Sequence, residues 1–202
     1  MAPPARQRIL AAADRLLRER GIARLTTREI AQAADAAEGS LTKNFGGKLG
    51  LLTTLLSQEL PELRAWRAAA TPPGDRPLRT VLVEIIERGI DFYAASLPLV
   101  AGAVADRDLF IRYQEVNARG GTGPQLAIDA VADYLAACRE AGELAPAADP
   151  YALALALCGA AQVQAYTEYI AGAGALRGTR RERAEALAET LLAGALREEG
   201  RS

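Results

Sequence analysis

Histidine is absent from this sequence of 202 residues, and aromatic residues make up only 5% of it. Without histidine the chain cannot form a Ser-His-Asp triad, a Cys-His pair or a His-ligated metal site. The acidic residues Asp106, Asp108 and Glu115 lie close together in the sequence, but helix capping and solvated charge explain them. We therefore expect no enzyme activity, no metal ion and no cofactor.

Cysteine is nearly as scarce, since only Cys138 and Cys158 occur. Both stand in apolar, helix-forming segments, which predicts buried free thiols in a reducing cytoplasm; a redox switch is the alternative. The N-terminal residues MAPPARQR lack an apolar signal core, which also favours a cytoplasmic location. Two glutamines and Glu168 interrupt the apolar stretch 151–176, so we expect no membrane span.

Strand signals are missing as well, because no alternating apolar and polar run is bounded by hairpin turns. Alanine and leucine dominate instead, and apolar residues recur at helical spacing, which predicts an all-α fold. The first helix is expected at residues 5–20, ending at Gly21, and a helix at 48–69 with a kink or break near Leu60 caused by Pro61. Further helices are expected at 77–95, 98–105, 107–118, 124–141, 150–172 and 180–198.

The most informative stretch is TTREIAQAADAAEGSLTKNFGGK, residues 26–48. Thr26 stands three residues before Glu29, the spacing of a capping box, so a short helix should begin there. Residues 35–38 interrupt the pattern, and a second short helix resumes with Leu41 and Phe45 on its core face. Short polar and cationic residues then face outward, as in the second helix of a helix-turn-helix, which lies in the major groove of DNA.

At these residues the chain resembles the N-terminal domain of the TetR family of bacterial transcriptional regulators. The resemblance rests on the order and spacing of RQRILAAADRLLRERG, LTTREIAQAA, EGSLTKNFGGK and LGLLTTLL, within the first 56 residues. It implies an N-terminal DNA-binding domain of three helices followed by a helical domain for ligand binding and dimerisation. The DNA-binding residues it implies are Thr27, Arg28, Ala37, Glu38, Ser40, Thr42, Lys43, Asn44 and Lys48.

Two positions depart from the family pattern. Asp35 stands where the family usually has a turn glycine, and Asp adopts positive φ at modest cost. Thr42 stands where a tyrosine is usual, and a threonine in place of that tyrosine lacks its phosphate contact. The charge distribution still favours docking of a polyanion, since residues 1–48 hold nine Lys or Arg and five Asp or Glu, a net of +4, whereas the remaining residues carry a net of −5.

The segment ATPPGDRP, residues 70–77, is the clearest linker. We therefore expect a DNA-binding domain at 1–48, a bridging helix at 48–69 and a second domain at 70–202. Aromatic residues interspersed with amides suit a small-molecule pocket, although a plain hydrophobic core is the alternative. The candidate ligand-binding residues are Trp66, Phe92, Tyr93, Phe110, Tyr113, Gln114, Asn117, Gln162 and Tyr166.

The last two helices carry small and apolar residues at three- and four-residue spacing. In the TetR family such helices form a four-helix dimer interface, whereas packing within one chain is the alternative. The candidate interface residues are Ala154, Cys158, Ala161, Ala165, Ala184, Leu187, Ala188, Leu191, Leu192 and Ala195.

These expectations combine into one hypothesis about function. The chain is expected to be a cytoplasmic, homodimeric transcriptional regulator, a repressor that a small apolar or amphipathic effector releases from a near-palindromic DNA operator. The alternative is a helical protein that binds small molecules or other proteins and whose DNA-binding module has degenerated.

Overall fold

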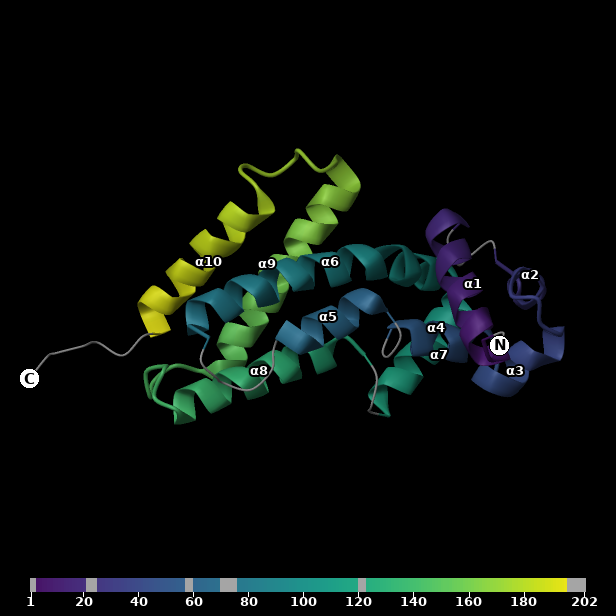
Figure 1. Cartoon of the computed structure of the whole chain (residues 1–202), viewed down its shortest axis with the longest axis horizontal. Coiled ribbons are helices and arrows are strands. Elements are labelled where there is room, and N and C mark those ends of the chain that lie inside the picture. Colours follow the sequence, from purple (N-terminus) through teal and green to yellow (C-terminus); the bar gives the residue numbers. More distant parts are fainter. Residues whose placement is uncertain (1–2, 21–24, 57–59, 70–75, 120–122, 196–202) are drawn as a thin grey trace, which may run out of the picture. The chain divides into compact units, whose positions relative to one another are not determined.

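The computed structural model describes residues 3–20, 25–56, 60–69, 76–119 and 123–195. The described part of the chain holds ten α-helices and no strand, which confirms the expected all-α fold (Figure 1). None of these helices is both long and apolar enough to cross a membrane. The contacts divide the chain into two compact units, residues 1–61 with 95–123 and residues 62–94 with 124–202.

This division differs from the boundaries expected at residues 48 and 70. The expected boundaries followed composition and a proline-rich segment, whereas the two units follow packing. Helix α6, Leu78–Ala105, contributes its first part to the second unit and its last part to the first. Most of the expected linker, residues 70–75, lies outside the described residues, as do Gly21 and residues 196–198.

The first unit contains the helices α1 (Ala5–Arg20), α2 (Thr27–Ala33), α3 (Glu38–Phe45), α4 (Lys48–Thr54) and α7 (Arg107–Ala118). Its first three helices contact one another, and α3 also packs on α4. The apolar faces expected from the sequence are buried here. Ile9, Ala13, Leu17, Ile30, Leu41 and Leu52 are among the side chains of this core.

The second unit contains α5 (Pro61–Ala69) from Glu62 onward, the first part of α6, α8 (Gln125–Glu140), α9 (Pro150–Ala171) and α10 (Arg180–Ala195). Helices α8 and α9 pack against each other. Asp149 caps α9 through hydrogen bonds from the N–H groups of Tyr151 and Ala152. The core includes Leu82, Ile86, Ile90, Leu135, Ala154 and Leu157.

Two prolines have opposite outcomes. Pro61 begins α5 after α4 has ended at Thr54, which confirms the expected break near Leu60. The expectation that Pro98 begins a separate helix is wrong, because Pro98 lies inside the continuous helix α6. A proline removes one backbone hydrogen bond, and burial of Leu99 and Ala103 in the following turn favours continuation of the helix.

Candidate nucleic-acid interface

Helix α2 begins with the expected capping box. The Glu29 N–H donates to Thr26 Oγ1 over 3.1 Å, and Glu29 Oε2 accepts from the Thr26 N–H over 2.9 Å. Hydrogen bonds from the backbone and hydroxyl of Thr26 lower the pKa of Glu29, so the carboxylate is the form that caps the helix. The start of α2 is therefore fixed by local chemistry.

The turn between α2 and α3 is a Schellman motif. Asp35 has φ of 47°, the left-handed conformation that the sequence suggested for this position. The N–H of Asp35 donates to Gln32 O over 3.1 Å, and the N–H of Ala36 donates to Ala31 O over 2.9 Å. An aspartate therefore occupies the turn position that glycine favours, at a modest conformational cost.

Helix α3 presents two distinct faces. Leu41 is fully buried and Phe45 is nearly so, as expected from their spacing. Thr42 and Lys43 are exposed, and Ser40 is half-buried. Asn44 is also exposed, but its Nδ2 donates to Ser40 O over 2.7 Å, so part of its hydrogen-bonding capacity is used within the helix.

The other candidate DNA-binding residues lie on or beside α2, α3 and α4. Arg28, Ala37 and Glu38 are exposed, whereas Thr27 and Lys48 are half-buried. The unit thus presents hydroxyl, amide and ammonium groups around α3, which is a combination suited to phosphate oxygens and base edges.

Arg8 is the feature that sequence reasoning missed. This α1 residue donates from Nε to Ala34 O over 3.0 Å and from Nη2 to Asp35 O over 2.7 Å. Its Nη1 also donates to Pro3 O over 3.0 Å. In addition, the guanidinium of Arg6 lies 5.5 Å from the centre of the Phe45 ring. No periodicity signals such contacts, because surface arginines at this spacing look like solvated charge.

Three of the candidate ligand-binding residues come together in the second unit. The rings of Trp66, Phe92 and Tyr93 lie 5.2–5.4 Å apart, and all three side chains are buried. The Trp66 Nε1–H has no hydrogen-bond partner among the described residues. A Cβ atom on Gly89 would lie 3.1 Å from Ala161 Cβ and 3.4 Å from the Trp66 ring. The absence of a side chain at Gly89 therefore leaves room for the Trp66 indole.

The remaining candidate ligand-binding residues are placed elsewhere. Phe110, Tyr113, Gln114 and Asn117 belong to α7, in the first unit. In the second unit, Gln162 is exposed on α9, and 55% of Tyr166 is accessible to solvent. The structure therefore supports one aromatic cluster rather than a single set of nine neighbouring residues.

Most of the candidate interface residues pack inside their own chain. Those with fully or nearly buried side chains are Ala154, Cys158, Ala161, Ala165, Ala184, Ala188 and Leu192. Leu187 and Leu191 are half-buried, and the side chain of Ala195 is outside the described part. Their helical spacing reflects packing within one chain, so other residues provide the surface that a partner could cover.

That surface lies on a neighbouring side of α9, next to the buried one. Six of the eight large hydrophobic residues that are exposed in the described chain belong to this helix, namely Tyr151, Leu155, Val163, Tyr166, Tyr169 and Ile170. Their spacing of three and four residues, bridged by Gly159, places them along one helical stripe. We call this set the α9 stripe.

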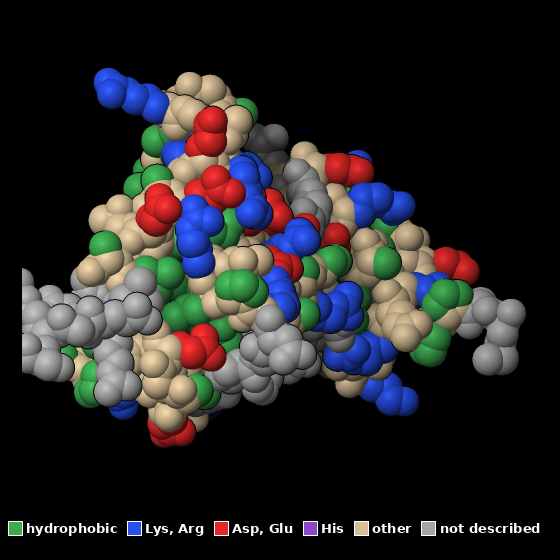
Figure 2. Space-filling view, turned by 60° about the vertical axis from the view of Figure 1, so that its left-hand side comes forward, with side chains coloured by type: hydrophobic (Ala, Val, Ile, Leu, Met, Phe, Trp, Pro, Cys, Tyr) green, Lys and Arg blue, Asp and Glu red, His purple; other side chains and the backbone are tan. Residues whose placement is uncertain are grey.

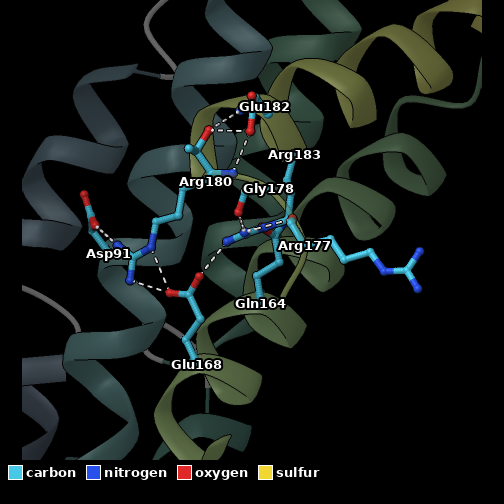
Figure 3. A network of polar contacts seen from close by, with 9 residues as sticks. Asp91, Gln164, Glu168, Arg177, Gly178, Arg180, Glu182 and Arg183 are labelled. Carbon is cyan, nitrogen blue, oxygen red and sulfur yellow. Dashed lines mark hydrogen bonds and ion pairs between the residues drawn. The ribbon is translucent and has the colours of Figure 1, made fainter. Parts of the chain in front are cut away.

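A polar network holds α9, α10 and α6 together within the second unit (Figure 3). Glu168 is only 7% exposed and accepts from Arg180 Nη2 over 2.6 Å and from Arg183 Nη2 over 2.5 Å. Arg183 also donates to Gln164 over 2.7 Å, and Arg180 reaches Asp91 on α6 over 3.1 Å. The near-buried carboxylate is thus compensated by two guanidinium groups.

Further ion pairs continue along these helices, including Arg181 with Glu87 and Arg79 with Glu189. Figure 2 shows acidic and basic side chains adjoining one another on one face of the molecule. The α10 helix begins with a second capping box, formed by Thr179 and Glu182.

The two cysteines are buried, and Asp106 caps a helix. Cys138 and Cys158 are buried free thiols, as predicted. Burial raises the pKa of Cys158 to about 12, while the Tyr93 hydroxyl hydrogen-bonds to its sulfur. Asp106 caps α7 by accepting from the Leu109 N–H over 3.1 Å. Among the described residues no group of His, Cys, Asp and Glu could hold a metal ion.

Comparison with known proteins agrees with this reading of the N-terminal helices. Residues 9–55 match the family model of the bacterial regulatory proteins of the tetR family. Over 55 residues the chain is 46% identical to the uncharacterized HTH-type transcriptional regulator YvkB of Bacillus subtilis. That match covers 27% of this chain and 29% of the relative, so it extends over less than a third of either protein.

Solved structures resemble the whole chain in fold. A tetR-family regulator from Mesorhizobium loti has a TM-score of 0.71 at 18% identity, covering 97% of this chain and all of that one. The SmeT–triclosan complex has a TM-score of 0.65 at 18% identity, covering 97% of this chain and 93% of that one. Residues 9–55 therefore match the tetR family of bacterial regulatory proteins in sequence, and the whole chain shares the fold of these solved tetR-family structures.

Proposed function

We propose that this protein is a transcriptional regulator of the TetR family, a ligand-responsive repressor that binds a near-palindromic DNA operator as a homodimer. The proposal rests on the two faces of α3. Thr42, Lys43 and Asn44 are exposed on one face. Leu41 and Phe45 are buried and anchor the other face in the core of the unit. A firmly anchored helix with a polar outer face is what major-groove recognition requires. The nine candidate DNA-binding residues remain those named from the sequence.

The proposed effector is a small apolar or amphipathic molecule, and its site includes the cluster of Trp66, Phe92 and Tyr93. Aromatic walls supply apolar contact, and the buried Trp66 N–H supplies one hydrogen-bond donor for an acceptor on the ligand. The structural relative SmeT forms a complex with triclosan. The effector shifts the equilibrium toward a state with lower DNA affinity by binding that state more tightly.

The proposed dimer interface is the α9 stripe, joined by the half-buried Leu187 and Leu191 of α10. Exposed aromatic and aliphatic side chains along one stripe favour association with a like surface. A two-fold axis pairs the stripe with its own copy and gives a bundle of four helices, two from each chain. Pairing also brings two copies of α3 onto one duplex, which a tight specific complex needs.

The test of the proposal is DNA binding by the full chain. Wild-type protein is incubated with a pool of random duplexes, and the selected duplex is used to measure the dissociation constant at several salt concentrations. We expect selection of a near-palindromic site. Failure to enrich any duplex would overturn the proposal and favour a helical binding protein with a degenerate DNA module.

The contribution of Lys43 is measured with the same duplex. Lys43→Ala should weaken binding and reduce the slope of log K against log salt by about 0.9, because one phosphate contact is lost. Arg139→Ala is the matched control, since Arg139 is an exposed cation at the end of α8 in the other unit. An unchanged salt slope in Lys43→Ala would show that the docking face is assigned wrongly.

A further inference from the structure

The turn that leads into α3 has two carbonyl groups that its own backbone bonds do not use. The Schellman motif engages the carbonyls of Ala31 and Gln32, whereas those of Ala34 and Asp35 lie just beyond the last turn of α2. Carbonyl groups at a helix C-terminus carry partial negative charge and favour a cation nearby. The guanidinium of Arg8 provides that cation and donates to both oxygens, over 3.0 and 2.7 Å.

The Arg8 contact stabilises an unfavourable backbone conformation at Asp35. Asp35 has φ of 47° and is the one non-glycine residue of the described chain with positive φ. Glycine adopts this conformation without a steric penalty, but aspartate does not. Two charge-assisted hydrogen bonds from Arg8 compensate for that cost at the residue that determines the direction of the chain into α3.

The other end of α3 is also in contact with α1. The guanidinium of Arg6 lies over the ring of Phe45, the last residue of α3, at 5.5 Å. The two arginines are separated by one residue on α1, so one short segment contacts the entry to α3 and its final turn. Arg8 also binds Pro3 O, which ties the segment before α1 to the same guanidinium.

We propose that Arg8 is a positioning residue for DNA recognition, which holds the turn before α3 in the geometry that docking requires. The inference rests on the proposed DNA-binding function. Arg8 acts through the backbone of Ala34 and Asp35, unlike Lys43, which is proposed to contact phosphate. The two roles differ in their salt dependence, because a residue that does not meet the phosphates releases no counterion on binding.

The experiment uses the full chain and the duplex that the wild type selects. Arg8→Gln should weaken binding about tenfold, the equivalent of one charge-assisted hydrogen bond, without changing the salt slope. Arg8→Lys should be impaired similarly, since a single ammonium group does not reproduce the two-pronged contact with both carbonyls. Arg15→Gln is the matched control, because it removes the same charge from an exposed position of α1.

Rescue distinguishes positioning from a general loss of stability. Asp35→Gly relieves the positive φ at the turn, so Arg8→Gln combined with Asp35→Gly should regain most of the lost affinity. Amide hydrogen exchange in Arg8→Gln should increase at Asp35 and Ala36, whose N–H groups make the turn bonds. These changes should be small elsewhere in α1 and α3.

Three results would overturn the inference. A salt slope lowered by about 0.9 in Arg8→Gln would identify Arg8 as a phosphate contact. Full affinity in Arg8→Lys would show that charge alone is sufficient. Absence of rescue by Asp35→Gly would show that the turn is not what Arg8 controls. A wild-type protein that selects no duplex would instead overturn the proposed function, and the exchange measurement would still test the contact.

Discussion

At the scale of single residues, the same kind of side chain has different roles in different surroundings. Lys43 is an exposed cation at the outer face of α3, whereas Arg8 directs its charge onto backbone carbonyls of the same unit. Glu29 and Glu182 cap helices, while Glu168 is enclosed by two guanidinium groups. Residue type alone therefore does not identify the DNA contacts of this chain.

Thr42 gives a prediction at this scale. Thr42 is exposed on α3 at the position where the TetR family usually has a tyrosine. Thr42→Tyr should therefore leave the melting temperature unchanged and tighten binding to the selected duplex by about two- to tenfold, through one added hydrogen bond to phosphate. The measurements are thermal unfolding and DNA titration. A lower melting temperature would contradict the outward placement of this residue, and equal affinity would argue against the phosphate contact.

At the scale of elements, the junction between α3 and α4 depends on a glycine for steric reasons. A Cβ atom on Gly50 would lie 1.6 Å from Phe45 O and 2.8 Å from Phe45 C. Both neighbouring atoms belong to the backbone, so they cannot move without displacing the end of α3. Gly50 consequently fixes how closely α4 approaches the helix proposed to bind DNA.

Gly50→Ala should therefore lower the free energy of unfolding by about 1–3 kcal/mol, as overpacking does. Gly39→Ala is the matched control, because Gly39 lies on α3 with nothing within 4 Å of its Cβ position. That control should keep or slightly raise stability, since alanine favours a helix by up to about 1 kcal/mol. Denaturant unfolding of both variants checks the prediction, and equal stability of Gly50→Ala and wild type would refute it.

At the scale of the whole molecule, the two proposed activities are linked by thermodynamics. An effector that binds the aromatic cluster of Trp66, Phe92 and Tyr93 and favours the state with low DNA affinity must itself bind more weakly when DNA is present. This reciprocity holds whatever the structural route between the two sites, because the free energy of binding effector and DNA is the same in either order. Trp66 is the single tryptophan of the sequence, so its fluorescence reports on this cluster alone.

Screening with small apolar aromatic compounds provides the measurement. A compound that changes Trp66 fluorescence should also raise the melting temperature, because it binds the folded state, and should weaken binding to the selected duplex. Compounds without an effect on fluorescence serve as controls and should leave DNA affinity unchanged. Compounds that bind the cluster and never alter DNA affinity would disprove the coupling, although they would leave the binding site itself intact.

The oligomeric state gives the second prediction at this scale. Val163 is 63% exposed at the middle of the α9 stripe, so Val163→Asp should convert the proposed dimer to a folded monomer and abolish the proposed tight DNA binding. Burying an unpaired charge in an interface costs several kcal/mol. Val104→Asp is the control, because Val104 is 52% exposed on α6 outside the stripe. Sedimentation that shows a Val163→Asp dimer would exclude this interface.

Local sequence signals determined much of the architecture. The helical spacing of apolar residues, the capping boxes of Thr26 and Thr179 and the break at Pro61 all lie within one or two helical turns. Such features act between neighbours in the chain, so the sequence is sufficient to predict them. The outward face of α3 followed from the same periodicity, because Leu41 and Phe45 fix which side is buried.

Only the tertiary structure decided which of two similar faces is covered. Ala154, Ala161 and Ala165 lie on one side of α9, and the α9 stripe lies on another. Both sides are apolar, so periodicity does not predict which of them packs against the rest of the chain. The same limit hid Arg8, whose partners lie 26 and 27 residues away in the sequence. Contacts between distant segments depend on how whole helices pack, which local spacing does not encode.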